Sequence, residues 1–277
     1  MNTEKQNTHY AKLRRNFRNK IKKTSIDSNI VGKYPYPNAV YLYGIHTVIS
    51  ALKNPKRHIY LLLITNNCLK KIQEHNITNL PKYEIVDSKS ISSLFEQDTV
   101  HQGIVAIAKP LESKPISKLA DSKLIVMLDQ ITDPHNVGAI MRSCVALGVE
   151  ALITTNRHSP KETGTLAKSA SGAVDLINYI NVRNLADTIN ELNNLGFTTI
   201  GLDSAGDANL SEMYKQNSYD KIALILGAEG KGLRDKTRKT VTTLARLDMP
   251  GAIKSLNVSN AASIAIYLTY CKLREYK

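Results

Sequence analysis

Two runs of the sequence are apolar at every position, Leu124–Leu128 and Ile222–Leu226. Successive side chains of a strand point to opposite faces of its sheet, so a strand that is apolar throughout has both faces buried. Sheets covered on both faces are typically parallel, with helices packed against each side. These two runs therefore predict an α/β fold with a largely parallel sheet, and the segments around them must supply its covering helices.

Shorter apolar segments alternate with helical patterns over residues 123–277. The further strands expected here are 151–154, 176–182, 197–202 and 244–247, and the expected helices are 137–147, 162–170, 185–195, 233–240 and 258–273. Ligand sites in parallel sheets lie beyond the carboxyl ends of the strands. Polar and glycine-rich clusters that follow strands are therefore the places to look for function.

A smaller α/β alternation occupies residues 40–108. Its expected strands are 40–43, 59–64, 83–86 and 104–108, and its expected helices are 45–52, 69–74 and 88–95, with Ser88 as a candidate N-cap. Residues 109–122 follow; they are polar around Pro110 and Pro115, which indicates a linker or a long surface loop. We therefore expect a small domain at 40–108, a linker at 109–122 and a larger domain at 123–277.

Positive charge is concentrated in the N-terminal segment of the sequence, before the two expected domains. The chain has 37 Lys and Arg against 24 Asp and Glu, a net charge of +13, and residues 1–40 hold nine of the basic residues against two acidic ones. This excess favours a polyanionic partner, nucleic acid ahead of a membrane surface. We interpret residues 1–39 as a flexible basic arm that binds phosphates. A solubilising tail and an organelle targeting peptide are the alternatives.

The cysteines and the apolar runs exclude several classes of protein. Cys68, Cys144 and Cys271 form no CxxC pair, so we expect neither a structural metal site nor a disulfide scaffold, and a reducing, cytoplasmic compartment fits. No run approaches the roughly 18 apolar residues of a transmembrane helix. Residues 1–40 also lack the apolar stretch of a secretory signal.

The first polar cluster, Asp133–Arg142, follows the strand that ends at Asp129 and opens a helix. Asp133 and Asn136 are both good N-cap types, so part of this polarity is explained by capping alone. Arg142 is less easily explained, because arginine is rarely buried without an anionic partner and the helix around it is otherwise apolar. A structural salt bridge is the alternative to a functional role for Arg142.

The second cluster, Gly227–Gly232, follows the most apolar strand of the chain. Three glycines among six residues allow the backbone to approach a ligand closely. The spacing is neither that of a dinucleotide-binding G-x-G-x-x-G loop nor that of a P-loop. A tight structural turn explains the cluster about as well as a binding loop does.

The third cluster, Met249–Ser259, is a loop rich in Pro and Gly that leads through Ser255 and Asn257 into a long apolar helix. Ser and Asn at this place are also good helix caps.

Taken together, the three clusters resemble the motifs of the SpoU (TrmH) family of RNA ribose 2′-O-methyltransferases, in the SPOUT superfamily. Asn136, Gly138 and Arg142 match the N-x-G-x-x-x-R motif; Leu226–Gly230 matches L-G-x-E-G, and Ser255–Ser259 matches S-L-N-V-S.

Two further segments extend the resemblance to the N-terminal domain. Tyr43–His46 and His101–Ile104 are similar to the subgroup that methylates a guanosine ribose in large-subunit rRNA. The similarity covers about residues 41–277, so the basic arm lies outside it.

The resemblance implies a fold, a cofactor and partners. The C-terminal domain would contain a trefoil knot that holds S-adenosyl-L-methionine through backbone atoms near Gly227, Leu247 and Leu256. The N-terminal domain would be an RNA-binding fold shared with some ribosomal proteins. Structured RNA, in particular large-subunit rRNA, would be the substrate, the protein would be a homodimer, and no metal would be required.

The resemblance also implies roles for five residues. Arg142 is the implied catalytic group, sometimes described as a base; because arginine normally stays protonated, we favour phosphate binding and stabilisation of alkoxide charge. Glu229 would orient Arg142 or accept the proton through water. Asn136, Ser255 and Asn257 would fix Arg142 and the ribose by hydrogen bonds.

Three alternatives remain at this point. The same chemistry could act on tRNA, although tRNA enzymes with these motifs usually lack the N-terminal domain. A non-catalytic RNA-binding protein of ribosome assembly is the second, and the presence of every motif residue argues against it. A nicotinamide oxidoreductase is the third, and it lacks the glycine fingerprint.

Overall fold

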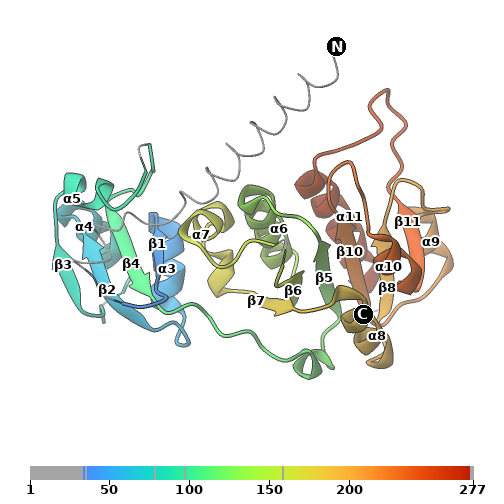
Figure 1. Ribbon diagram of the computed structural model, residues 1–277, viewed down its shortest axis with the longest axis horizontal. Coiled ribbons are helices and arrows are strands. Elements are labelled where there is room, and N and C mark those ends of the chain that lie inside the picture. Colours follow the sequence, from blue (N-terminus) through green and yellow to red (C-terminus); the bar gives the residue numbers. More distant parts are fainter. Residues whose placement is uncertain (1–33, 35, 78, 97, 158, 275–277) are drawn as a thin grey trace, which may run out of the picture.

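The computed structural model describes residues 34, 36–77, 79–96, 98–157 and 159–274. Within these ranges the chain forms a smaller and a larger β-sheet, each with its own helices (Figure 1). Most of the basic arm predicted at residues 1–39 lies outside the described residues. In the ranges given, no helix is both long enough and apolar enough to cross a membrane.

The smaller sheet is mixed and has the order β1-β4-β2-β3 within the described ranges. Its strands are β1 (Val40–Tyr43), β2 (Ile59–Ile64), β3 (Tyr83–Ile85) and β4 (Ile104–Ala108), and its helices are α3 (Ile45–Lys53), α4 (Asn66–Glu74) and α5 (Ser88–Ser92). β4 runs antiparallel to β1 and β2, whereas β3 is parallel to β2. The expected alternation of strands and helices is confirmed here.

The larger sheet has the order β7-β6-β5-β10-β8-β11-β9 within the described part of the chain, and all its pairings are parallel. Its strands are β5 (Leu124–Asp129), β6 (Ala151–Thr155), β7 (Asn178–Val182), β8 (Thr198–Leu202), β9 (Ala208–Asn209), β10 (Ile222–Gly227) and β11 (Thr243–Arg246). The helices with it are α6 (Pro134–Ala146), α7 (Gly164–Ala170), α8 (Leu185–Asn194), α9 (Leu210–Gln216), α10 (Asp235–Thr240) and α11 (Val258–Arg274), and the 3₁₀ turns are η1 (Ile116–Leu119) and η2 (Ala173–Asp175).

The central strands β5 and β10 are buried on both faces. Alternate β5 residues such as Val126 pack into the core that α6 and α11 cover, while the intervening Met127 packs into a separate core with α8. Val126, Met127 and their β10 partners Leu224 and Ile225 are all 0% exposed. The prediction of a parallel sheet covered on both faces is therefore confirmed.

Several predicted boundaries are wrong for identifiable reasons. Asp87 and not Ser88 caps α5, because its carboxylate accepts the Ser90 amide at 2.6 Å. The helix expected from residue 162 begins at Gly164, because Thr163 caps it by accepting the Leu166 amide at 3.2 Å. β9, α9 and both 3₁₀ turns were not predicted; they are short, and their patterns carry little periodicity.

Candidate active site

The end of β5 sets the position of the first motif. Gln130 has a positive φ of 63° immediately after the strand, which turns the chain towards α6. Asp133 caps α6 by accepting the His135 amide at 2.9 Å, and Pro134 takes the first helical position. Asn136 is therefore not needed as a cap. It lies in the first turn of α6, where its side chain is available for other contacts.

Glu229 connects the second motif to the third. Its Oε1 atom accepts two hydrogen bonds, one from Asn257 Nδ2 at 2.7 Å and one from the Val258 amide at 2.9 Å. The same Asn257 Nδ2 donates to Asn136 Oδ1 at 3.1 Å. The three motifs, far apart in the sequence, thus meet at the side chain of Asn257.

The other end of the Asn257 amide stabilises the start of α11. Its Oδ1 atom accepts the Ser259 amide at 2.9 Å and the Ser259 hydroxyl at 2.5 Å. Ser263, one turn further on, bonds through its hydroxyl to that of Ser143 on α6 at 2.7 Å. Asn257 is therefore both a helix cap and the junction of the motifs, and α11 is tied to the helix that carries Arg142.

The side chains of Arg142 and Ser255 are exposed at the surface. Neither side chain forms a hydrogen bond or an ion pair with any residue that the structure describes, and no such bond joins Glu229 to Arg142. Arg142 follows Asn136 by six residues, about 9 Å along the helix axis. A surface guanidinium with free donors suits recognition of an anionic group.

The loop that carries Glu229 is fastened at both ends. Gly227 pairs in register with Asp129 of β5, and Asp129 accepts the Arg234 amide at 3.0 Å and its Nε at 2.6 Å. Asp129 is 0% exposed, which strengthens this ion pair. Gly227 also packs so closely on Gly232 that an added Cβ would lie 2.2 Å from the Gly232 carbonyl carbon. The loop is thus held in one conformation around Glu229.

A second ion pair supports the same loop from the neighbouring strand. Arg238 on α10 donates to Asp203, which follows β8, at 2.6 Å. Sequence reasoning gave no role to Asp129, Asp203, Arg234 or Arg238. An acidic residue at the end of a buried strand is the signal that could have pointed to the two aspartates.

A cavity of about 170 Å³ opens beside the carboxyl ends of β9 and β11. It is lined by Asn209, Leu210, Ser211, Arg246, Leu247, Asp248, Met249, Leu256, Ile264 and Leu268. Two of the three predicted cofactor contacts, Leu247 and Leu256, belong to this lining. Gly227 is not among the lining residues and lies at the end of β10, on the same edge of the sheet.

The donor set of this cavity fits a ligand with both apolar and polar parts. The leucine, isoleucine and methionine side chains offer an apolar wall, and Leu256 is 41% exposed, so its apolar surface is accessible. Arg246 holds the carbonyl oxygens of Gly206 and Asp207 at 2.8 and 2.6 Å, which stiffens the cavity wall. These residues suit S-adenosyl-L-methionine, whose adenine is flat and weakly polar.

Two further side chains of α6, the buried Cys144 and the exposed His135, have structural roles. Burial raises the pKa of the Cys144 thiol far above its ordinary value, so Cys144 on α6 is a neutral core residue and not a nucleophile. His135 lies at the start of α6 and its Nδ1 is 3.0 Å from Ser169 Oγ on α7.

The larger domain is a parallel sheet on which three polar loops converge, and a small mixed-sheet domain precedes it in the sequence. This is the architecture of an RNA ribose methyltransferase. Comparisons with known proteins agree: the model of the SpoU rRNA methylase family matches residues 123–267, and that of the RNA 2′-O ribose methyltransferase substrate-binding domain matches residues 41–114. The chain belongs to the SpoU rRNA methylase family. The expected class, an RNA 2′-O-methyltransferase that uses S-adenosyl-L-methionine, is confirmed.

Individual relatives extend over most of the chain. It is 34% identical to the 23S rRNA (guanosine-2′-O-)-methyltransferase RlmB of Ralstonia nicotianae over 239 residues, which are 82% of this chain and 93% of that protein. RlmB of Vibrio vulnificus is also 34% identical, over 82% of this chain and 94% of its own length.

Solved structures share the fold. The SpoU methyltransferase AviRb of Streptomyces viridochromogenes superimposes with a TM-score of 0.72 at 18% identity, over 91% of this chain and 95% of that one. An AdoMet-bound rRNA methyltransferase of Sinorhizobium meliloti gives 0.70 at 22% identity, over 85% and 88% of the two chains. The trefoil knot remains an expectation from the family resemblance.

Proposed function

We propose that this protein transfers a methyl group from S-adenosyl-L-methionine to the 2′-hydroxyl of a guanosine in 23S rRNA. The observation that carries the proposal is the junction at Asn257, where Glu229 and Asn136 meet. The named relatives that span most of this chain, 23S rRNA guanosine methyltransferases, support the substrate.

The cofactor would lie along the edge of the sheet where β9, β10 and β11 end. Leu247 and Leu256 would contact its apolar parts, and the close backbone packing at Gly227 would shape the adjoining wall. When bound, the cofactor supplies an electrophilic methyl group on a sulfonium. The protein's task is then to place the ribose hydroxyl in line with that group and to stabilise the charge that the oxygen develops.

Arg142 is the residue we assign to that charge. Its side chain is free of partners in the described structure. A guanidinium is a strong hydrogen-bond donor and no acceptor, so it suits a phosphate or a developing alkoxide better than a base role. Glu229 would position Asn257, as its hydrogen bond indicates, and would take up the proton through water. Asn136 and Ser255 would hold the ribose.

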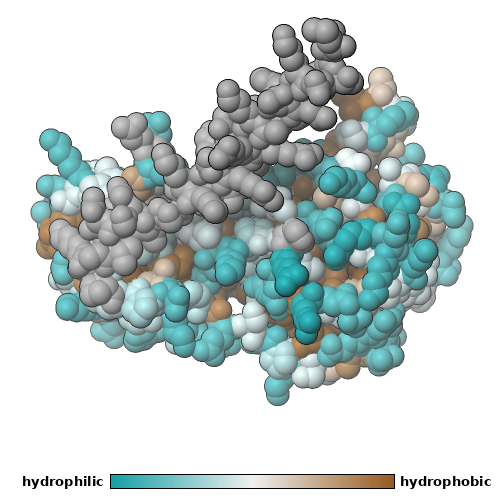
Figure 2. All heavy atoms as spheres, in the orientation of Figure 1, coloured by the Kyte–Doolittle hydropathy of each residue, from teal (hydrophilic) through white to brown (hydrophobic). Residues whose placement is uncertain are grey.

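The N-terminal domain and the basic arm would bind the RNA around its target. Tyr36, which precedes the domain, stacks on Tyr60 of β2 with the ring centroids 4.8 Å apart, and such rings suit unpaired bases. Hydrophilic residues dominate the face of the larger domain drawn in Figure 2, as expected of a surface that meets a hydrated polyanion. We propose that the arm at residues 1–39 adds sequence-independent contacts to phosphates.

A homodimer is the assembly we propose. On α11, Ile264 and Tyr267 are 45% and 55% exposed, which leaves apolar surface on a helix next to the site. A second copy of the chain would cover this surface. Cys68, Cys144 and Cys271 are free thiols, which suits the cytoplasm as the compartment of the proposed activity.

Methyl transfer to unmodified RNA tests the proposed function. Labelled S-adenosyl-L-methionine is incubated with large-subunit rRNA and, in parallel, with bulk tRNA, and the labelled ribose is mapped by its resistance to alkaline cleavage. Label at one guanosine of the rRNA is the expected result. Label on tRNA alone would keep the chemistry and overturn the substrate, and the absence of both transfer and cofactor binding would favour a non-catalytic RNA-binding protein.

A further inference from the structure

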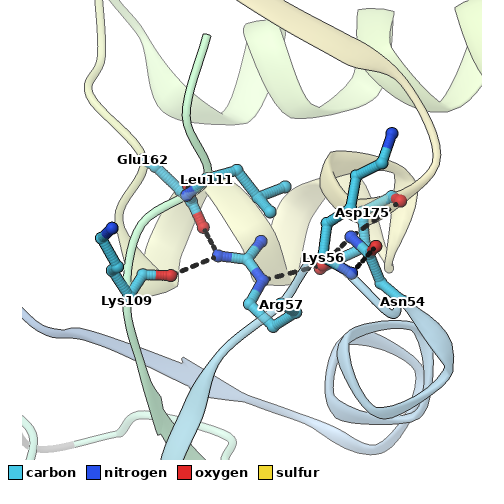
Figure 3. Close-up of polar contacts among 7 residues, drawn as sticks. All are labelled: Asn54, Lys56, Arg57, Lys109, Leu111, Glu162 and Asp175. Carbon is cyan, nitrogen blue, oxygen red and sulfur yellow. Dashed lines mark hydrogen bonds and ion pairs between the residues drawn. The ribbon is translucent and has the colours of Figure 1, made fainter.

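A buried ion-pair cluster joins the two domains (Figure 3). Arg57, in the turn between α3 and β2, donates from Nε to Asp175 Oδ1 at 2.8 Å and from Nη1 to Glu162 Oε1 at 2.5 Å. The side chains of Arg57 and Asp175 are 0% exposed and that of Glu162 is 9% exposed. Arg57 belongs to the smaller domain, whereas both carboxylates belong to the larger one, so this cluster lies between them.

Each carboxylate is also bonded to the smaller domain or to the segment that follows it. Asn54 Nδ2 donates to Asp175 Oδ1 at 2.9 Å, and the Leu111 amide donates to Glu162 Oε2 at 2.8 Å. Burial alone would lower the pKa of Arg57, but the hydrogen bond and charge of Asp175 and the charge of Glu162 outweigh it, and the pKa is raised. The guanidinium is therefore charged, and its removal would leave two carboxylates without their cation.

The surfaces on either side of this cluster fit closely. Thr47 on α3 donates its hydroxyl hydrogen to the Ala167 carbonyl of α7 at 3.1 Å. Gly164 at the start of α7 faces Tyr41 of β1, where an added Cβ would lie 2.4 Å from the carbonyl oxygen. Gly172 faces Ser50 in the same way, with a Cβ placed 2.2 Å from its hydroxyl oxygen. The two domains thus pack closely against each other, and Arg57 closes one end of the interface.

The opposite side of α7 contacts the helix of the first motif, and α7 lies between the smaller sheet and α6 in Figure 1. Gly138 of the motif packs on α7 so closely that a Cβ would lie 2.5 Å from that of Ser169. Ser169 also bonds to His135 at 3.0 Å. A single helix therefore separates the substrate-binding domain from the helix that carries Asn136 and Arg142.

We propose that Arg57 is a positioning residue: it fixes the substrate-binding domain on α7, so that RNA held by this domain meets the α6 site of the same chain in one register. The expected effect on methyl transfer to RNA rests on the proposed function. The expected effect on the distance between the domains rests on the interface geometry alone. Without the Arg57 cluster the domains keep residues 109–122 and the packing of α7 on α3 and β1, but they lose the ion pairs at one end of the interface. The target ribose then loses its fixed distance from Arg142. Precise placement of reactants is what such an enzyme must supply.

The first test measures the distance between the domains in the full-length protein. Spin labels are attached at Lys89→Cys and Glu191→Cys, both exposed positions, with Cys271→Ser to remove the part-exposed thiol. A narrow distance distribution is expected for the parent protein and a clearly broader one for Arg57→Ala. Lys56→Ala is the matched control, because it removes an exposed neighbouring charge without touching either carboxylate. An unchanged distribution in Arg57→Ala would overturn the proposal.

A second variant separates positioning from a simple loss of folding. Arg57→Met combined with Glu162→Gln and Asp175→Asn removes the ion pairs without leaving a bare buried charge. The same broadening is expected in this triple variant, with S-adenosylhomocysteine binding kept within about twofold because the cavity is untouched. If the triple variant restores the narrow distribution, Arg57 serves only to neutralise the two buried carboxylates and does not hold the domains together. The proposal then fails.

Steady-state methyl transfer supplies the functional readout. For Arg57→Ala kcat is expected to fall about tenfold, because RNA held by the smaller domain no longer meets the α6 site in one register, while the KM for rRNA changes little. A rise in KM alone with an unchanged kcat would contradict the positioning role. Should the parent protein methylate no rRNA, the proposed function fails, and the distance distributions still decide whether Arg57 fastens the domains.

Discussion

The Nδ2 atom of Asn257 lies 2.7 Å from Oε1 of Glu229, across 28 residues of sequence. The same nitrogen reaches Asn136 at 3.1 Å, across 121 residues. One side-chain amide therefore holds the loop after β10 against the first turn of α6, while its oxygen caps α11. The contacts among the three motifs depend on this residue.

Asn257→Ala is expected to lower kcat/KM by about 100-fold, because Glu229 and Asn136 lose their common donor. Loss of the helix cap should cost about 1 kcal/mol of unfolding free energy, which leaves the protein folded. Methyl transfer and urea unfolding measure the two effects. Asn260→Ala, an exposed position on the same helix, is the control and should change neither. Activity near that of the parent would remove Asn257 from the site.

Gly227→Ala is expected to destabilise the protein by about 1–3 kcal/mol, because the new Cβ would lie 2.2 Å from the Gly232 carbonyl carbon, which is backbone. Displacement of this loop should also weaken S-adenosylhomocysteine binding, as measured by calorimetry. Gly251→Ala is the matched control, since a Cβ there has open space around it. Equal binding in both variants would show that the β10 end does not shape the cofactor site.

Arg142→Ala is expected to abolish methyl transfer and leave the unfolding temperature unchanged, because the exposed side chain has no partner among the described residues. Arg142→Lys should recover only part of the activity, since an ammonium cannot make the paired contacts of a guanidinium. Arg183→Ala, another exposed arginine, controls for the loss of one positive charge. Retention of transfer in Arg142→Ala would show that the charge is stabilised by another group.

Much of the fold follows from local pattern. The all-apolar runs at β5 and β10 predict a parallel sheet, because only burial on both faces explains them, and the structure has such a sheet. Short elements such as β9 and α9 were missed, since two to seven residues carry too little periodicity. The early start predicted for α7 was wrong because Thr163 caps the helix by accepting the Leu166 amide, a local signal that the apolar pattern alone does not carry.

The site was predictable as a set of residues and not as a set of contacts. Asn136, Glu229 and Asn257 were recognised from their motifs, and the structure brings them together. The partner of Glu229 could not be inferred: it bonds to Asn257 and to no arginine that the structure describes, because the loops bring distant residues together in a way that spacing does not reveal. Arg57 carried no signal at all, since a lone arginine between two elements is typical of an exposed turn.

Deletion of residues 1–38 is expected to weaken RNA binding and to flatten its salt dependence. For each phosphate that the shortened chain no longer neutralises, the slope of log K against log salt should become shallower by about 0.7–0.9. Filter binding at several salt concentrations, with cofactor binding as the control for folding, makes the measurement. A weaker affinity with an unchanged slope would mean that the segment acts without binding phosphates.

The folding stability is expected to fall between about pH 7.5 and pH 5.5 through His101. Burial lowers the pKa of this histidine, which is 7% exposed. Its Nδ1 accepts the Gly103 amide at 3.1 Å and its Nε2 lies 3.0 Å from Ser92 Oγ, which donates its own hydrogen to the Ser88 carbonyl. The folded state therefore requires the neutral ring with its hydrogen on Nε2, and a second proton on Nδ1 would face the Gly103 N–H.

The sign follows from proton binding in the two states. The unfolded chain protonates His101 near its ordinary pKa of about 6.5, whereas the folded protein does so only at lower pH. The histidine's contribution to stability is complete above the ordinary pKa and is lost as the pH falls through the window down to the lowered one. His101→Asn keeps an acceptor near the Gly103 amide and cannot titrate. Urea unfolding at about pH 7.5 and 5.5 should therefore show a smaller loss of stability in His101→Asn than in the parent, and equal losses would mean that His101 does not control the acid sensitivity.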